Sequence, residues 1–206
     1  MKFKNLEMTG FKSFSEKTTI LIEKGLTGIV GPNGCGKSNI VEALRWCMGE
    51  NSAKSMRGSG MEDVIFSGTS NRPSKNISEV ALLLDNQEKS GPIQYKEFDE
   101  ISIKRKIEKD KGSKYYINDK EVRARDVQTF FADLSTGAHS PSLISQGRIG
   151  QLVTAKPIER KSILEEAAGI SGIHARRQEA ETRLNAAENN LKRADELKRQ
   201  QQKQLD

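Results

Sequence analysis

Eight consecutive residues, Gly31–Ser38, have the types and the spacing to bind the phosphate groups of a nucleotide. They read Gly-Pro-Asn-Gly-Cys-Gly-Lys-Ser and match the pattern G-x-x-x-x-G-K-[ST] in full. Glycines let the backbone pass close to phosphate oxygens, so that successive N–H groups converge on them. In such a loop Lys37 should bridge the β- and γ-phosphates of ATP, and Ser38 should ligate Mg²⁺. The pattern therefore predicts a phosphate-binding loop that uses ATP and Mg²⁺.

The segments on either side of this loop have the character that such a loop requires. Leu26–Val30 is apolar and predicts a strand that runs directly into it. After it, apolar residues at helical spacing predict a helix from about Lys37 to Met48, with Gly49 as its stop. The N-terminus of that helix adds positive potential where phosphate would bind.

The rest of the first 134 residues alternates between β-like runs and loops. Asn51–Arg72 is rich in Ser and Gly and predicts a surface loop around a short run at Val64–Phe66. The other predicted elements are strands at 3–8 and Thr18–Ile22, a buried strand at Glu79–Leu84, an edge or half-exposed strand at Ile101–Ile107, a hairpin at Tyr115–Val122 and an amphipathic helix at Val127–Leu134. These elements predict an α/β fold with a mixed sheet, a helix packed on it and a β-rich arm.

The last quarter of the chain differs from the rest. Pro157 suits the first turn of a helix, and we expect Gly169 and Gly172 to interrupt that helix. From Ile173 to Asp206 there is no glycine, proline, Phe, Trp or Tyr. One heptad seam runs through this stretch, although it is weak: Ala180, Leu184, Ala187, Leu191, Ala194, Lys198, Gln201 and Leu205. We expect two regions, a lobe at 1–156 and a protruding helix at 157–206 that starts a coiled coil; a single solvated helix is the alternative.

The composition says more about the cellular location of the protein than about its function. The 206 residues carry a formal net charge of +6, which is compatible with nucleic-acid binding without establishing it. Cys35 and Cys47 should lie about 15 Å apart along the chain, beyond disulfide reach. Met1 leads directly into charged residues, and no apolar run is long enough to cross a membrane. We therefore expect a cytoplasmic location and no membrane partner.

Several other segments resemble functional motifs without completing them. Val80–Asp85 resembles a strand that ends in a metal-orienting aspartate, but Asn86 follows where a catalytic glutamate would be needed, so a strand running into an Asx turn is favoured. Leu134–Gly137 resembles an ATPase signature motif but lacks its second glycine, which favours a helix end. The basic run from Lys104 to Lys111 fits a solvated hairpin as well as a DNA patch.

Five blocks occur together in one order, and the combination is more specific than the phosphate-binding loop alone. They are Phe11–Phe14, Gly31–Glu50, Met56–Thr69, Ile144–Ile149 and Lys156–Ile170. In this order the chain resembles the N-terminal head segment of a bacterial structural-maintenance-of-chromosomes (SMC) protein of the condensin type. The resemblance covers essentially the whole chain, and it implies one lobe of an ABC-type ATPase head with a coiled-coil arm.

The resemblance also implies roles for particular residues. ATP would be bound by Lys12 and by the loop residues Pro32, Asn33, Gly34, Cys35, Gly36, Lys37, Ser38 and Asn39. Gln146 would join Ser38 on Mg²⁺ and sense the attacking water, while Arg57 would neutralise charge during phosphoryl transfer. Lys37, Arg57 and Gln146 are thus the expected catalytic residues, and Lys120, Arg123 and Arg125 are candidates for DNA contact.

In this family the head is completed by other chains or segments. The signature serine and the Walker B Asp-Glu pair come from the C-terminal half of the same long protein, so residues 1–206 alone should not hydrolyse ATP. Further implied partners are a second head in a homodimer, double-stranded DNA, and a kleisin-type subunit at the neck helix. The implied processes are chromosome condensation and segregation, sister chromatid cohesion and DNA replication.

Two other functions remain open from the sequence. One is a repair or recombination ATPase with a similar head, which would differ mainly in the missing half. The other is a structural module that does not hydrolyse ATP, in which the glycine loop only binds nucleotide or is vestigial. The intact Lys37 and Ser38 count against a vestigial loop.

Overall fold

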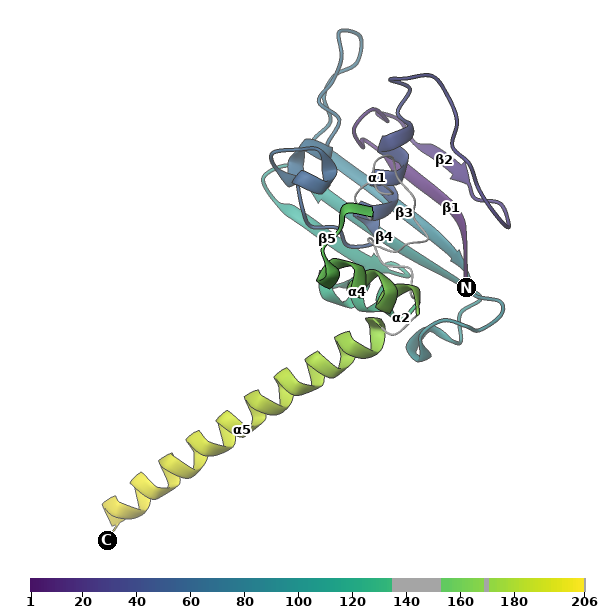
Figure 1. Ribbon diagram of the computed structural model, residues 1–206. Coiled ribbons are helices and arrows are strands. Elements are labelled where there is room, and N and C mark those ends of the chain that lie inside the picture. The colour runs from purple at the N-terminus through teal and green to yellow at the C-terminus, as the bar shows by residue number, and fades with distance from the viewer. Residues whose placement is uncertain (135–152, 169–170, 206) are drawn as a thin grey trace.

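The computed structural model describes residues 1–134, 153–168 and 171–205, and within these residues the main feature is a six-stranded sheet (Figure 1). Its strand order is β2-β1-β3-β4-β5-β6, and every described pairing is antiparallel. The strands are β1 (Lys2–Thr9), β2 (Thr18–Leu21), β3 (Ile77–Asp85), β4 (Glu100–Glu108), β5 (Gly112–Ile117) and β6 (Lys120–Val122).

One face of this sheet carries the core, because alternate residues of each strand point to the same side. Val80 on β3 and Ile103 on β4 are fully buried there. Two helices cover that face, α1 (Lys37–Cys47) over β3 and β4, and α2 (Ala124–Asp133) over β5. Trp46 of α1 and Phe131 of α2 belong to the same apolar cluster. The expected α/β head-lobe fold is confirmed, and α1 begins and ends where the sequence predicts.

The strand expected at Leu26–Val30 does not form. The segment has no strand assignment, and the side chains of Leu26 and Val30 are almost completely exposed. A strand needs a neighbour to pair with its backbone groups, and none of the described strands pairs with this segment. The apolar sequence is therefore present without the partner that would make it a strand.

The strand predicted at Ile101–Ile107 is half-exposed, but it does not lie at an edge. It forms most of β4, which pairs with β3 on one side and with β5 on the other. The alternation that indicated an edge comes from having one face on the core and one in solvent, which a central antiparallel strand also shows.

The serine- and glycine-rich stretch between α1 and β3 contains two short 3₁₀ turns, Lys54–Met56 and Met61–Val64. A third turn, Ile93–Tyr95, lies between β3 and β4. The predicted apolar run Val64–Phe66 is buried, and Ile65 bridges to Phe11 in the loop after β1. This bridge brings the segment around Arg57 close to the start of α1.

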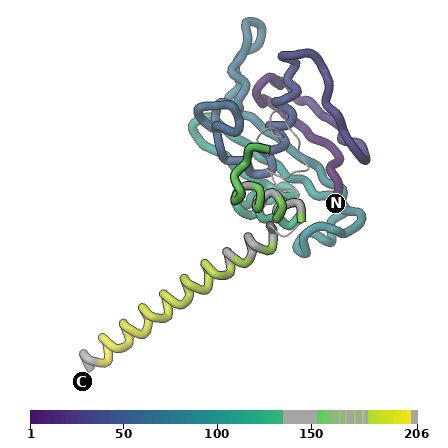
Figure 2. Tube along the Cα trace, in the orientation of Figure 1, coloured from purple at the N-terminus to yellow at the C-terminus, as the bar shows by residue number. Residues whose placement is uncertain are grey.

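Two helices follow at the C-terminal end. α4 (Pro157–Ala167) begins at Pro157, as predicted, and α5 (Ser171–Leu205) extends away from the sheet as one long helix (Figure 2). α4 ends at Ala167 and α5 starts at Ser171, so the helix that begins at Pro157 is interrupted in this region, as predicted, and Gly172 lies in the first turn of the second helix. Gly169 lies outside the described residues. No helix in the part of the chain that the structure describes is long and apolar enough to span a membrane.

The predicted heptad seam on α5 is exposed from Ala180 to Gln201, including Leu184 and Leu191. The first turns of α5 lie near α2, and the rest of this helix extends beyond the lobe (Figure 1). A coiled coil requires a second helix along this seam, and it stays a prediction.

Candidate functional site

The phosphate-binding loop precedes α1 directly, with its glycines in conformations that other residues rarely adopt. Gly34 has φ of 82° and Gly36 has φ of 90°, and Gly36 is the N-cap of α1. A Cβ atom added at Gly36 would lie 2.9 Å from the hydroxyl of Ser13, so the loop also needs a small residue there. Residues 31–35 are exposed, which leaves the loop open to a ligand.

Lys37 is folded back over this loop. Its ammonium group donates hydrogen bonds to the carbonyl oxygens of Gly31 and Pro32, both at 2.6 Å, and lies 3.8 Å from the sulfur of Cys35. The positive charge is thereby held above the loop and near the N-terminus of α1, whose first N–H groups add positive potential. The arrangement fits the binding of an anionic phosphate group.

The donor set fits ATP with Mg²⁺. Ser38 is exposed in the first turn of α1, next to Lys37, where its hydroxyl can reach a metal held by phosphate oxygens. Among the described residues no group of three or more His, Cys, Asp or Glu side chains could bind a metal by itself. A phosphate-bound Mg²⁺ needs few protein ligands, so a hydroxyl is adequate. Gln146, the other expected ligand, lies outside the described residues.

Beside the loop lies a group of polar residues that we call the Glu42 cluster: Lys12, Ser13, Asn39, Glu42 and Arg57. Glu42, on α1, pairs with the ammonium of Lys12 through one carboxylate oxygen and with Nε of Arg57 through the other. Arg57 Nη2 also donates to Asn39 Oδ1 at 2.8 Å, and Asn39 Nδ2 donates to Ser13 Oγ at 2.9 Å. The structure thus brings together Lys12, Asn39 and Arg57, three of the residues expected at the ATP site.

Glu42 was not among the residues predicted from the sequence. Its side chain is only 9% exposed, and Lys12 at 13% is nearly as buried. Glu42 is the one charged residue among the buried residues of α1, and a charge within such a set is the signal that could have identified it, since buried charges need partners. Lys12 is one of the two cations paired with Glu42, and its ammonium also donates a hydrogen bond to the carbonyl oxygen of Met56.

Arg105 corrects the interpretation of the basic run as solvated, because it is only 2% exposed. Its guanidinium lies 4.4 Å from the ring of Trp46 and 4.6 Å from that of Tyr115. It donates to the carbonyl oxygens of Trp46 at 2.9 Å and Glu50 at 2.6 Å, at the C-terminal end of α1. Burial lowers the pKa of Arg105, opposed by the neighbouring Tyr115. This residue connects the helix of the phosphate-binding loop to the sheet.

Of the two incomplete motifs, Val80–Asp85 has the structure that the sequence favoured, and Leu134–Gly137 is described only at its first residue. Asp85 ends β3, and its carboxylate accepts a hydrogen bond from the backbone N–H of Gln87 at 2.9 Å, which is an Asx turn. Asn86 is buried and donates to the carbonyl of Phe98 at 2.8 Å. Leu134 caps the end of α2, and the remainder of that motif lies outside the described residues.

The candidate DNA residues lie on β6 and at the start of α2. Lys120, Arg123 and Arg125 are all exposed. Arg123 is already paired with Asp126 at 3.0 Å, and its backbone N–H donates to the same carboxylate as the cap of α2. Lys120 and Arg125 therefore carry the charge that is more available to a partner.

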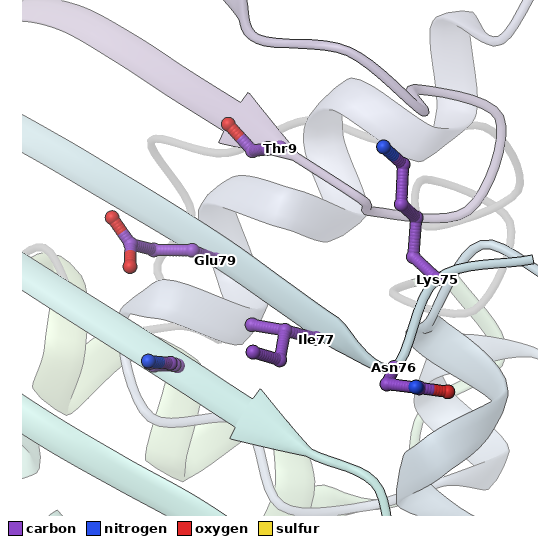
Figure 3. Close-up of a pocket in the computed structure, with 6 residues that line it drawn as sticks. Thr9, Lys75, Asn76, Ile77 and Glu79 are labelled. Carbon is purple, nitrogen blue, oxygen red and sulfur yellow. The ribbon is translucent and has the colours of Figure 1, made fainter.

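A pocket on the other face of the sheet lies away from the phosphate-binding loop. Figure 3 shows Thr9, Lys75, Asn76, Ile77 and Glu79 around it, and Lys106 also lines it. Thr9, Glu79 and Lys106 are cross-strand neighbours. Residues next to them in the strands, such as Met8 and Val80, are buried in the core, so these three face the other side of the sheet. No residue of the phosphate-binding loop contributes to this pocket, so it is not the candidate site.

Comparisons with known proteins agree with this geometry. The model of the family described as RecF/RecN/SMC N terminal domain matches residues 2–148. The chromosome partition protein Smc of Cereibacter sphaeroides is 57% identical over 197 residues, which cover 96% of this chain but only 17% of that relative. This chain therefore spans about a sixth of the length of that relative.

Solved structures give the same family. A structure from work on the ATP-driven dimerization and DNA-stimulated activation of SMC ATPases matches with a TM-score of 0.69 and 32% identity, over 81% of this chain and 99% of that one. The Smc head domain of Pyrococcus furiosus, bound to the C-terminal domain of ScpA, matches with a TM-score of 0.75 and 34% identity, over 95% of this chain and 49% of that one. The chain belongs to the RecF/RecN/SMC N-terminal domain family, and within it corresponds to the N-terminal segment of a bacterial SMC protein.

Proposed function

We propose that this chain is the N-terminal half of the ATP-binding and ATP-hydrolysing head of a chromosome condensation and segregation protein, which organises DNA through ATP-driven engagement of two heads. The observation that supports this best is the position of Lys37 over an exposed glycine loop at the N-terminus of α1. The likeness to SMC ATPases and to a chromosome partition protein favours this reading over the other two.

In this proposal Gly31–Asn39 binds the triphosphate of ATP. The backbone N–H groups of the loop and the N-terminus of α1 donate to phosphate oxygens, and Lys37 exchanges its two carbonyl contacts for the β- and γ-phosphates. Ser38 and Gln146 hold Mg²⁺, which offsets the charge on the phosphates. Each of these contacts uses a group that the loop already presents.

Arg57 and Lys12 place two positive charges beside the loop. We propose that Arg57 stabilises the charge that develops on the γ-phosphate during hydrolysis, because it is 57% exposed and is held through Asn39 close to the loop. Lys12 contributes through its field, since its ammonium is bound by Glu42 and the carbonyl of Met56. The water-polarising glutamate is proposed to come from the C-terminal half.

The C-terminal half is also the proposed partner of Leu26–Val30. This segment is apolar, exposed and without a strand neighbour among the described residues, although it leads into the phosphate-binding loop. Pairing with strands of the other half would bury Leu26 and Val30 and satisfy the backbone. At about 25 cal/mol per Å² of apolar surface, burial of two such side chains contributes about 3–5 kcal/mol.

The other proposed partners act at different places on the head. A kleisin-type subunit is proposed to bind the neck helix at the base of α5; the solved Smc head domain of Pyrococcus furiosus is bound to the C-terminal domain of ScpA, which supports a partner of this kind. Double-stranded DNA is proposed to contact Lys120, Arg123 and Arg125. A second head would close the ATP site from the opposite side.

Phosphate release by residues 1–206, with and without the C-terminal half, tests this function. The fragment alone should be inactive, because its sequence has no Asp-Glu pair at the end of an apolar strand to polarise water and no complete signature motif. Addition of the C-terminal half should restore slow turnover that rises faster than linearly with protein concentration, since two heads must meet to complete each site. Turnover by the fragment alone that is lost in Lys37→Ile would contradict the division of the site between the two halves.

A further inference from the structure

The Glu42 cluster contains an anionic residue at the one place where an ATP site needs positive charge. A carboxylate beside a triphosphate lowers the affinity for ATP unless it has another role. Glu42 is almost buried, and both of its oxygens are used, one by Lys12 and one by Arg57. Its position therefore calls for an explanation that involves these two cations.

The contacts of Arg57 supply this explanation. Its Nε is paired with Glu42, and its Nη2 donates to Asn39 at 2.8 Å. The remaining nitrogen, Nη1, has no hydrogen-bond partner in the part of the chain that the structure describes. Two fixed contacts hold the planar guanidinium in one orientation, which costs less entropy than positioning it at the moment of reaction.

Arg57 would be poorly placed without these contacts. It has φ of 54°, it ends a three-residue turn, and more than half of its side chain is exposed. Lys12 has φ of 47° and lies in a different loop, yet the same carboxylate holds it. Because Glu42 is on α1, five residues after Lys37, it ties both loops to the helix that carries the phosphate-binding loop.

We propose that Glu42 is a positioning residue, which holds Arg57 and Lys12 in place for the γ-phosphate through the two oxygens of one carboxylate. This inference rests on the proposed function, because it assigns Arg57 to the phosphoryl-transfer step. It predicts that Glu42 affects turnover more than the affinity for ATP. It also predicts that the position of Arg57 depends on Glu42 before any nucleotide binds.

The first test reads the position of Arg57 without nucleotide. Phenylglyoxal, which condenses with accessible guanidinium groups, is applied to the protein, and modification of Arg57 is followed by peptide mass spectrometry. Glu42→Gln should raise the rate of phenylglyoxal modification of Arg57 at least about threefold. Glu50→Gln is the matched control. Glu50 is also a buried carboxylate, it lies just after α1, and it pairs with Arg45 at 3.1 Å and not with Arg57. An equal rate at Arg57 in wild type and Glu42→Gln would overturn the proposal.

Glu42→Gln leaves the ammonium of Lys12 without its carboxylate, and this can destabilise the fold. The double variant Lys12→Gln/Glu42→Gln removes both charges and keeps both side chains polar. It should melt close to wild type and still show faster modification of Arg57. A double variant that folds but modifies at the wild-type rate would also contradict the role of Glu42.

The second test uses the complete head, formed with the C-terminal half. Glu42→Gln should lower kcat about tenfold or more while KM for ATP changes less than about threefold. Combined with Arg57→Ala, it should cost clearly less than the product of the two single losses, because both changes remove the placed charge of Arg57 and only the contribution of Lys12 is left to lose. Multiplicative losses would mean that Glu42 acts independently of Arg57. ATP turnover that persists in Lys37→Ile would instead contradict the proposed function, and the modification test would still decide the position of Arg57.

Discussion

The side chains of Lys37 and Cys35 lie close together within the phosphate-binding loop, with the ammonium 3.8 Å from the sulfur. Cys35 is exposed, whereas the only other cysteine, Cys47, is buried at the end of α1. A ligand bound in the loop should therefore cover the thiol of Cys35, while the thiol of Cys47 is buried in any case. The labelling rate of Cys35 can therefore be used to measure nucleotide binding.

We predict that iodoacetamide labels Cys35 and leaves Cys47 unmodified in the folded protein. Burial raises the pKa of Cys47 to about 12, and because only the thiolate reacts, this thiol stays protonated and inert from pH 7 to pH 9. MgATP should protect Cys35 at least about tenfold in rate. Cys35→Ser should abolish labelling, and Lys37→Ile should abolish the protection; labelling of Cys35 that MgATP does not slow would exclude the loop as the binding site.

At the scale of elements, α1 is fixed to the rest of the lobe at both ends. Glu42 connects its first half to two loops, and Arg105 on β4 binds the carbonyl oxygens of Trp46 and Glu50 at its C-terminal end. A cation at a helix C-terminus also interacts favourably with the helix dipole. The candidate phosphate-binding loop therefore leads into a helix that is tied to the sheet and to two loops.

We predict that Arg105→Met lowers the free energy of unfolding by about 2–4 kcal/mol. The change removes a charged donor from the carbonyl oxygens of Trp46 and Glu50, at about 1–3 kcal/mol each, although the Trp46 oxygen keeps the N–H of Gly49 at 3.2 Å and methionine retains part of the packing against Trp46 and Tyr115. Lys106→Met, the next residue on β4, faces the other side of the sheet and should change stability by less than about 0.5 kcal/mol. Urea unfolding measures both variants, and equal effects would show that the buried contacts of Arg105 contribute little.

Much of this architecture could be predicted from local patterns in the sequence. The phosphate-binding loop, the limits of α1, the Asx turn at Asp85 and the start of α4 at Pro157 each depend on a few neighbouring residues. The errors depend on distant partners. Leu26–Val30 has the composition of a strand but lacks a neighbour, and Arg105 appears solvated until Trp46 and Tyr115 are placed around it.

The Glu42 cluster was only half predictable for the same reason. The family resemblance indicated Lys12, Asn39 and Arg57 individually. Their common carboxylate became visible only when the loop at Lys12 and the turn at Arg57 were brought to one side of α1. Gln146 is also expected at this site, and it stays a prediction because it lies outside the described residues.

At the scale of the molecule, the lobe has two features that call for partners. One is the unpaired apolar segment Leu26–Val30, and the other is α5, whose heptad leucines Leu184 and Leu191 are exposed. A basic region at Lys120 and Arg125 adds a third surface at the start of α2. These features are consistent with the proposed assembly, in which the chain acts together with a C-terminal half and DNA.

We predict weak, sequence-independent binding of duplex DNA by the complete head, with an affinity that falls steeply between 50 and 200 mM salt because counterion release drives it. Arg125→Glu and Lys120→Glu should weaken binding more than Arg123→Glu, since the charge of Arg123 is already paired with Asp126. Fluorescence anisotropy against salt concentration measures this. An affinity that is flat with salt, or one that depends on DNA sequence, would contradict the proposed contact.

The claim on which the others depend is that Gly31–Ser38 binds MgATP through Lys37. Titration calorimetry of MgATP into the complete head tests it most directly, in wild type, in Lys37→Ile and in Lys24→Ile, where an exposed lysine outside the loop serves as the control. Loss of one charged hydrogen-bonding group on a phosphate costs about 2 kcal/mol, so Lys37→Ile should weaken binding at least about 30-fold. Lys24→Ile should bind as wild type does. Equal affinities for wild type and Lys37→Ile would contradict the assignment of the loop and, with it, the proposed function.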